Sequence, residues 1–274
     1  TANLKSDILS HCNNLKIVSR HGVGYDNIDL DYLNENKIPL AITGQSNAIS
    51  VAEHVMTMML TLSKNIFASD NLVRSNDFNK KSELPDFYEL YMKKILILGF
   101  GRIGQALAKR CLGFEMDVYV FDPYINNEII SSRNCKPINK LDGYKIADYI
   151  SIHLPLNEST KNLISFNEFK LFKKNLILIN TARGGIVDEV ALYESLKKNE
   201  IFAAGLDVFN EEPPKKNNVL FNLNNIILTP HNSALTIECR KRMAIESCQN
   251  VVYYLKKDKS LNIKNIINLK KINY

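Results

Sequence analysis

The chain has 274 residues, of which 45% are hydrophobic and 23% are charged, a composition typical of globular proteins with one large or two ordinary domains. No apolar run approaches the length that spans a bilayer and no signal peptide opens the chain, so we expect no membrane association and a cytoplasmic location. The net charge of +6 comes mostly from lysines spread along surface-type segments without interleaved aromatic residues, which argues against a nucleic-acid partner.

The cysteines are dispersed and show neither CxxC nor Cys/His ligand spacing. Such an odd, scattered set is typical of reduced thiols, and we therefore expect no metal site. The five positions are Cys12, Cys111, Cys135, Cys239 and Cys248.

The first part of the chain predicts a small domain. Residues 4–11 pattern as a short helix, and the segments "LKIVSR" and "IPLAIT" pattern as strands. Ser50 precedes Glu53 by three positions, the spacing of a capping box, and apolar residues follow at helical intervals. We predict that a helix begins there and leads into a larger second domain, with His54 as a surface or interface residue.

From residue 93 onward, strands and helices alternate regularly. Strands are predicted in "KKILILGF", "DVYVFD", "ADYISIHLP", "NLILIN", "FAAGLDVF" and "NIILTP", with helical segments between most of them. This alternation predicts an α/β fold with a doubly wound parallel sheet. A final helix from Ile237 to about Lys257 comes too late to extend the sheet. We predict a partial substrate-binding domain over 1–46, a Rossmann domain over 47–233, and a C-terminal helix and tail over 234–274 that packs on the first domain.

A glycine motif follows the first strand of the larger domain. In "GFGRIG", Gly99, Gly101 and Gly104 have GxGxxG spacing, and the motif directly follows a strand and opens a helix. That context favours dinucleotide binding over a plain glycine turn, because free helix amides can hold a pyrophosphate. Asp122 ends the next strand, where its carboxylate can accept hydrogen bonds from ribose hydroxyls and repel a 2′-phosphate. We therefore predict NAD as the cofactor.

Three polar residues follow the late strands of this domain: Arg183, Glu212 and His231. Ligands of open α/β sheets bind beyond the carboxyl ends of the strands. Histidine can exchange a proton near neutral pH, a carboxylate stabilises its imidazolium, and arginine binds a carboxylate in a bidentate fork. Each residue alone also suits an ordinary loop, but together they match hydride exchange at C2 of a 2-oxo or 2-hydroxy acid.

Seven segments in order resemble the D-isomer-specific 2-hydroxyacid dehydrogenases, a family that includes phosphoglycerate dehydrogenase, hydroxypyruvate and glyoxylate reductases and D-lactate dehydrogenase. The segments are "RHGVGYDNIDL", "SNAISVAEHVM", "LGFGRIGQALAK", "HLPLNESTKNLI", "INTARGGIVDE", "AAGLDVFNEEP" and "TPHNS". The resemblance implies an NAD-dependent enzyme that acts on a small D-2-hydroxy or 2-oxo acid of the 3-phosphoglycerate, hydroxypyruvate or glyoxylate type, and we expect a homodimer.

The resemblance also assigns roles to residues. It implies that His231 is the acid/base, that Glu212 pairs with it, and that Arg183 orients the substrate. The amides of Val23 and Gly24 would hold the substrate carboxylate, with Asn47 at the domain junction. Cofactor contacts carry over to the motif glycines and to Arg102, Ile103, Asp122, Pro155, Thr181, Ala182 and Asp207, with Asp207 toward the nicotinamide carboxamide.

The chain departs from the family pattern at two places. Members have a further strand and helix before the segment that starts here, so we expect an N-terminally incomplete, flavodoxin-like substrate domain. Met92 stands where glycine is usual. One alternative function is an NAD(H)-sensing, corepressor-like binding protein on the same fold. Formate dehydrogenases share the architecture but typically pair the histidine with glutamine, so Glu212 argues against that activity.

Overall fold

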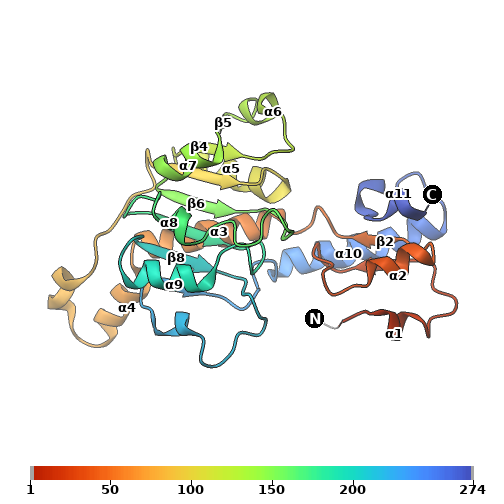
Figure 1. Ribbon diagram of the computed structural model, residues 1–274, viewed down its shortest axis with the longest axis horizontal. Coiled ribbons are helices and arrows are strands. Elements are labelled where there is room, and N and C mark those ends of the chain that lie inside the picture. The colour runs from red at the N-terminus through yellow and green to blue at the C-terminus, as the bar shows by residue number, and fades with distance from the viewer. Residues whose placement is uncertain (1–2, 273–274) are drawn as a thin grey trace. The chain divides into compact units, whose positions relative to one another are not determined.

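The computed structural model describes residues 3–272, which form two compact units (Figure 1). The first unit contains the described residues up to Ser50 and from Ala234 onward, and the second is Val51–Ser233. The division between Ser50 and Val51 falls within the first turn of helix α3 (Ala48–Ser63). The predicted extent of each domain stays a prediction.

The second unit is built on a seven-stranded sheet with the order β5-β4-β3-β6-β7-β8-β9. Every neighbouring pair of strands is parallel. The chain order reverses its direction across the sheet between β3 and β6, which is where doubly wound sheets bind their ligands. The strands are β3 (Lys94–Leu98), β4 (Asp117–Phe121), β5 (Lys136–Pro137), β6 (Tyr149–Ile152), β7 (Ile177–Asn180), β8 (Ala203–Leu206) and β9 (Ile226–Leu228).

Helices cover both faces of this sheet, which explains why its central strands are continuous apolar runs. In β3, Ile95 and Ile97 point into the core beneath α3 and α5, whereas Leu96 and Leu98 point into the core beneath the helices of the other face. This alternation follows from the two-residue period of a strand. The helices of the second unit that follow α3 are α4 (Ile66–Arg74), the 3-10 helix η1 (Phe78–Glu83), α5 (Arg102–Gly113), α6 (Asn127–Ser131), α7 (Lys140–Ile146), α8 (Phe166–Phe169), α9 (Glu189–Lys197) and the 3-10 helix η2 (Val219–Asn222).

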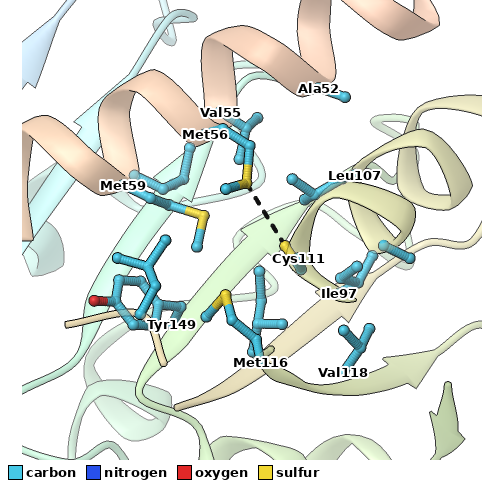
Figure 2. Packing of buried hydrophobic residues seen from close by; sticks show 14 of the residues in the cluster. Ala52, Val55, Met56, Met59, Ile97, Leu107, Cys111, Met116, Val118 and Tyr149 are labelled. Atoms are coloured by element: carbon cyan, nitrogen blue, oxygen red, sulfur yellow. Dashed lines mark hydrogen bonds between the residues drawn. The ribbon is translucent and has the colours of Figure 1, made fainter. Parts of the chain in front are cut away.

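The core beneath α3 and α5 is rich in sulfur. Figure 2 shows Val55, Met56 and Met59 of α3 pointing toward Cys111 of α5, whose sulfur lies 3.8 Å from that of Met56. Burial raises the pKa of the Cys111 thiol to about 12, so this cysteine stays protonated and packs as a small apolar side chain.

The first unit is smaller, with a two-stranded parallel sheet of β1 (Val18–Arg20) and β2 (Leu40–Ile42). The C-terminal part of the chain packs on these strands through Ser19, whose hydroxyl donates to the carbonyl of Ser247 at 2.9 Å. Asn268 holds the start of β2, accepting from the Leu40 amide and donating to the Ile38 carbonyl, both at 2.9 Å. The helices of this unit are α1 (Ser6–Leu9), α2 (Leu30–Glu35), α10 (Ile237–Leu255), the 3-10 helix η3 (Ile263–Asn265) and α11 (Leu269–Ile272).

The structure shows the local conformation at two positions that the sequence analysis singled out, Ser50 and Met92. Ser50 does not begin a helix, because α3 already begins at Ala48, and the Ser50 hydroxyl lies 2.9 Å from that of Thr236. The predicted capping box is therefore wrong, since the same spacing also occurs inside a helix. Met92 has φ of 56°, the left-handed conformation that glycine adopts most readily.

Candidate active site

The glycine turn after β3 is a tight contact between backbone segments. Gly99 has φ of 98°, and a methyl group on it would come within 2.8 Å of the carbonyl oxygen of His153. A methyl group on Gly104 would lie 2.2 Å from the carbonyl oxygen of Gly99, closer than any real contact. On Gly101 it would meet nothing within 4 Å, so this position faces open space. Gly99 and Gly104 thus shape the turn, and Gly101 leaves room above it.

The turn leads directly into α5, a helix of 12 residues whose N-cap is Gly101. Among the described residues, no side chain caps this helix end by a hydrogen bond. Its first amides therefore remain available to a ligand at the positive end of the helix dipole. An open approach over Gly101 with uncapped amides beneath fits the phosphates of a dinucleotide. Arg102 and Ile103 form the first turn of this helix, and Arg102 is exposed.

Asp122 holds the same turn from the end of β4. One of its carboxylate oxygens accepts from the Phe100 amide at 2.7 Å and the other from the Tyr124 amide at 2.9 Å. A carboxylate oxygen has two acceptor sites, so each retains capacity for a hydroxyl donor. The partly exposed Asp122 is therefore oriented by the backbone and able to accept from a ribose.

Further predicted cofactor residues lie after β6 and β7, the next strands along the sheet. Pro155 is exposed, Ala182 is half-buried and Thr181 is buried. The Thr181 hydroxyl and the Nδ1 atom of His153 are both buried and have no hydrogen-bond partner among residues 3–272. Burial lowers the pKa of His153 to about 3, so its ring is neutral. Buried polar atoms without partners are costly, and their position at this edge of the sheet suits a bound polar ligand.

The three predicted catalytic residues follow three neighbouring strands. Arg183 comes after β7, Glu212 after β8 and His231 after β9, and these strands are parallel and adjacent. The structure pairs two of them directly, because Nδ1 of His231 lies 2.7 Å from a carboxylate oxygen of Glu212. The other oxygen of Glu212 accepts from the Phe209 amide at 3.1 Å, which fixes the carboxylate. The side chains of His231 and Glu212 are 50% and 37% exposed, so a substrate can reach them.

Arg183 begins a turn whose backbone is held by the side chain of Asn180. Asn180 donates from its side chain to the Arg183 carbonyl at 2.9 Å and accepts from the Ala182 amide at 3.0 Å. The next residue, Gly184, has no room for a methyl group, which would lie 1.8 Å from the Phe209 carbonyl oxygen. The half-buried arginine is thus fixed to the segment that leads to Glu212.

The predicted substrate residues Val23, Gly24 and Asn47 belong to the first unit. Val23 and Gly24 lie in the loop after β1, where the Gly24 carbonyl accepts from Nε of Arg20 at 2.7 Å. Asn47 directly precedes α3, and all three residues are half-buried. Their substrate role stays a prediction.

Asp207, predicted to contact the cofactor, is fully buried after β8. Its carboxylate accepts from the Thr229 hydroxyl at 2.6 Å and from the amides of Asn232 and Ser233 at 2.9 and 3.0 Å. These contacts were not predicted, and neither was the contact of His54, whose Nε2 lies 3.1 Å from the Thr229 hydroxyl. The available signal was a histidine directly before the apolar residues Val55 and Met56 of α3.

The larger part of the chain matches a known protein family. Residues 56–233 match the model of the D-isomer specific 2-hydroxyacid dehydrogenase, NAD binding domain. The chain belongs to this family, and the glycine turn, uncapped helix and Asp122 lie within its NAD-binding domain. The predicted family and the doubly wound fold are thereby confirmed.

Individual relatives support the same assignment. The chain is 38% identical to D-3-phosphoglycerate dehydrogenase of Methanocaldococcus jannaschii over 96% of its own length and 50% of that protein. It is 37% identical to hydroxypyruvate reductase of Thermotoga maritima over 90% of its length and 79% of that protein. The crystal structure of D-lactate dehydrogenase from Aquifex aeolicus, complexed with NAD and lactic acid, superposes with a TM-score of 0.87 at 31% identity, covering 97% of this chain and 84% of that one. The chain thus spans about half the length of the phosphoglycerate dehydrogenase it matches.

Residues 3–272 contain no group of three or more His, Cys, Asp or Glu side chains that could hold a metal ion. None of the helices in this range combines the length and apolar character needed to cross a lipid bilayer.

Proposed function

We propose that the protein is an NAD-dependent oxidoreductase that interconverts a small D-2-hydroxy acid and the corresponding 2-oxo acid. The observation that carries this proposal is the His231–Glu212 pair at 2.7 Å, whose residues follow β8 and β9, the next two strands in the sheet after the one that bears Arg183. An acid/base with a carboxylate partner and a cation beside it are the groups that proton-coupled reduction of a 2-oxo acid requires.

In this proposal His231 exchanges the proton through its Nε2 atom. A carboxylate only accepts hydrogen bonds, so the proton between the two side chains belongs to Nδ1 of His231. The neutral ring then has its acceptor at Nε2, which can take the proton of a 2-hydroxyl group. In the reductive direction the imidazolium, stabilised by Glu212, donates that proton to the forming hydroxyl oxygen. Bound NAD supplies the two-electron acceptor or donor at C2.

Arg183 has the complementary role of binding the substrate. Its guanidinium can hold the substrate carboxylate in a bidentate fork and polarise the neighbouring carbonyl, which orients C2 for reaction. We assign Val23 and Gly24 to the same carboxylate and Asn47 to the substrate region. Arg102, Ile103, Pro155, Thr181, Ala182 and Asp207 are assigned to the cofactor.

Asp122 sets the choice of cofactor in this proposal. Its carboxylate is fixed by two backbone amides and would repel the 2′-phosphate of NADP(H). We expect a preference for NAD(H) that weakens in Asp122→Ala. Equal kcat/KM for NADH and NADPH in the wild type would contradict this assignment.

The deciding experiment is NADH oxidation with hydroxypyruvate, glyoxylate and pyruvate, with His231→Ala as the control variant. Turnover with one of these acids that is lost in His231→Ala supports the dehydrogenase. NADH binding without turnover of any 2-oxo acid would favour a binding protein that senses the nucleotide. Full activity in His231→Ala would remove the acid/base assignment.

We also propose that the chain forms a homodimer through α4 and η1. In the part of the chain that the structure describes, α4 has no buried residue, and Figure 1 shows it standing away from the sheet. Ile66, Phe67, Val73 and Phe78 on this segment are at least half exposed, with Phe67 at 67%. Such a patch is unfavourable in water unless another surface covers it. We expect a dimer by light scattering, and a monomer for Phe67→Glu but not for Tyr124→Glu elsewhere on the surface.

A further inference from the structure

A buried carboxylate lies beneath the loop that carries His231. Asp207 has none of its surface exposed, and a charge in that position needs compensation by hydrogen bonds. Its three hydrogen-bond donors all come from the loop Thr229–Ser233: the Thr229 hydroxyl and the amides of Asn232 and Ser233. The carboxylate therefore holds this loop on both sides of His231.

This support is needed because His231 has an unfavourable backbone conformation. Its φ is 52°, a left-handed value that is uncommon for residues other than glycine. Residues persist in that region only when their surroundings hold them there. The ring of His231 is half exposed, so packing around the side chain contributes little to its position. The position of His231 therefore depends on the hydrogen bonds of the residues on either side of it.

His54 extends the support to helix α3. Its Nε2 atom lies 3.1 Å from the Thr229 hydroxyl oxygen and 3.9 Å from the nearer oxygen of Asp207. The Thr229 hydroxyl has one proton, and it donates that proton to Asp207. Its oxygen must then accept from His54, so Nε2 of His54 carries a proton. Desolvation lowers the pKa of His54, partly opposed by Asp207, and a neutral ring with its proton on Nε2 satisfies the same contact.

We propose that His54 is a positioning residue for the acid/base of the reaction, acting through Thr229 and the Asp207 carboxylate on the loop that bears His231. The inference rests on the proposed function of His231. Within residues 3–272, His54 forms its hydrogen bond with Thr229 and not with His231 or Glu212, and it lies 175 residues from Thr229 in the sequence. Its contribution is the direction and rigidity of the loop, which decide whether Nδ1 of His231 meets Glu212.

The test compares His54→Leu with His54→Gln. Leucine removes the donor, whereas the glutamine side-chain amide restores a donor near the position of Nε2. We expect His54→Leu to lower kcat by roughly 10- to 100-fold, the range for a small misplacement of a catalytic group, with KM for NADH changed less than about 2-fold. His54→Gln should recover most of kcat. Thr229→Val should reproduce the loss, and the double variant should be no worse than either single one. Thr57→Val, on the exposed side of α3, is the control and should behave as wild type.

A count of NADH-binding sites separates positioning from a general loss of folded protein. Less folded enzyme has fewer binding sites, but kcat per binding site stays as in the wild type. If His54→Leu loosens the pair of His231 and Glu212, kcat per binding site falls while the number of sites is unchanged. Wild-type kcat per site in both His54→Leu and Thr229→Val would overturn the proposal.

A measurement without turnover keeps this inference distinct from the proposed function. The nuclear magnetic resonance signals of the His231 ring, assigned by comparison with His231→Ala, report its environment in the protein alone. We expect one sharp set in the wild type and His54→Gln, and shifted or broadened signals in His54→Leu and Thr229→Val. If the wild type turns over no 2-oxo acid, the proposed function fails while these signals still decide the role of His54. Identical signals in all four proteins would overturn it.

Discussion

The glycine turn and the loop that bears His231 lie in the same unit but are built by opposite means. At the turn, the proposed cofactor contact is the backbone itself, and the close packing of Gly104 on Gly99 fixes it sterically. At the loop, the proposed acid/base is a half-exposed side chain on a left-handed backbone, and a buried carboxylate holds the loop by hydrogen bonds. Under the proposed function, a few consecutive residues specify the cofactor cradle, whereas the acid/base needs support from distant residues.

The largest effect should come from a methyl group in the turn. Gly104→Ala would place that methyl 2.2 Å from the carbonyl oxygen of Gly99, so β3 and α5 must separate. We expect a loss of several kcal/mol in the free energy of unfolding, within the range for overpacking and backbone strain. Gly101→Ala meets nothing within 4 Å, and should keep its stability while raising the Kd for NADH. Chemical denaturation and NADH titration of both variants measure this, and equal stability losses would break the comparison.

Substitution of Arg183 tests whether this residue binds substrate or only forms a salt bridge at the surface. Arg183→Ala should lower kcat/KM for the 2-oxo acid by about 2–3 kcal/mol, since hydrogen bonds to charged groups are worth that much. Arg183→Lys keeps the charge but loses the fork, so it should recover only part of the activity. Steady-state kinetics at fixed NADH would refute the assignment if Arg183→Ala stayed near wild-type activity.

A buried histidine beside the glycine turn makes the stability of this region depend on acid. His153 contacts the glycine turn through its carbonyl, and burial lowers its pKa to about 3. Below about pH 6.5 the unfolded chain takes up a proton at this residue and the folded chain does not. The free energy of unfolding therefore decreases as the pH is lowered from about 6.5 to about 3. When the pH is lowered from 7 to about 4.5, we expect the free energy of unfolding of His153→Gln to decrease by about 2 kcal/mol less than that of the wild type. Parallel denaturation curves at both pH values would contradict a buried neutral ring.

The smallest expected effect is that of removing the carboxylate charge from the exposed pair. Glu212→Gln removes the charge but keeps the shape, so the imidazolium of His231 loses its stabilising partner. We expect kcat/KM in the reductive direction to fall by about 1.5 kcal/mol, the lower end for a hydrogen bond to a charged group. The measurement is kcat/KM of wild type and variant with the same 2-oxo acid. An unchanged kcat/KM would mean that Glu212 holds the loop without affecting the proton.

The parts of the fold that the sequence predicted are those with a strong local pattern. The apolar runs of β3, β6 and β7 and the turn at Gly99 follow from consecutive residues, and the strand ends bring Arg183, Glu212 and His231 to one edge. The segment between Asp122 and Tyr149 contains α6, β5 and α7. Strand β5 is not predicted from the sequence, because it has only two residues and little apolar pattern. The hydrogen bonds that join His54, Thr229 and Asp207 could not be predicted, because the three residues lie on separate elements that only the folded sheet brings together.

The first unit is formed by two segments that are far apart in the sequence, and this has a consequence for folding during synthesis. Strand β2 depends on Asn268, which is 228 residues downstream of Leu40. A ribosome that adds about 5–20 residues per second needs on the order of ten to fifty seconds to cover that distance. The second unit is fully synthesised within this interval and can fold while still attached to the ribosome. Of the two units, the one whose strands are translated first is therefore completed second, and until then the nascent chain exposes apolar residues of β2.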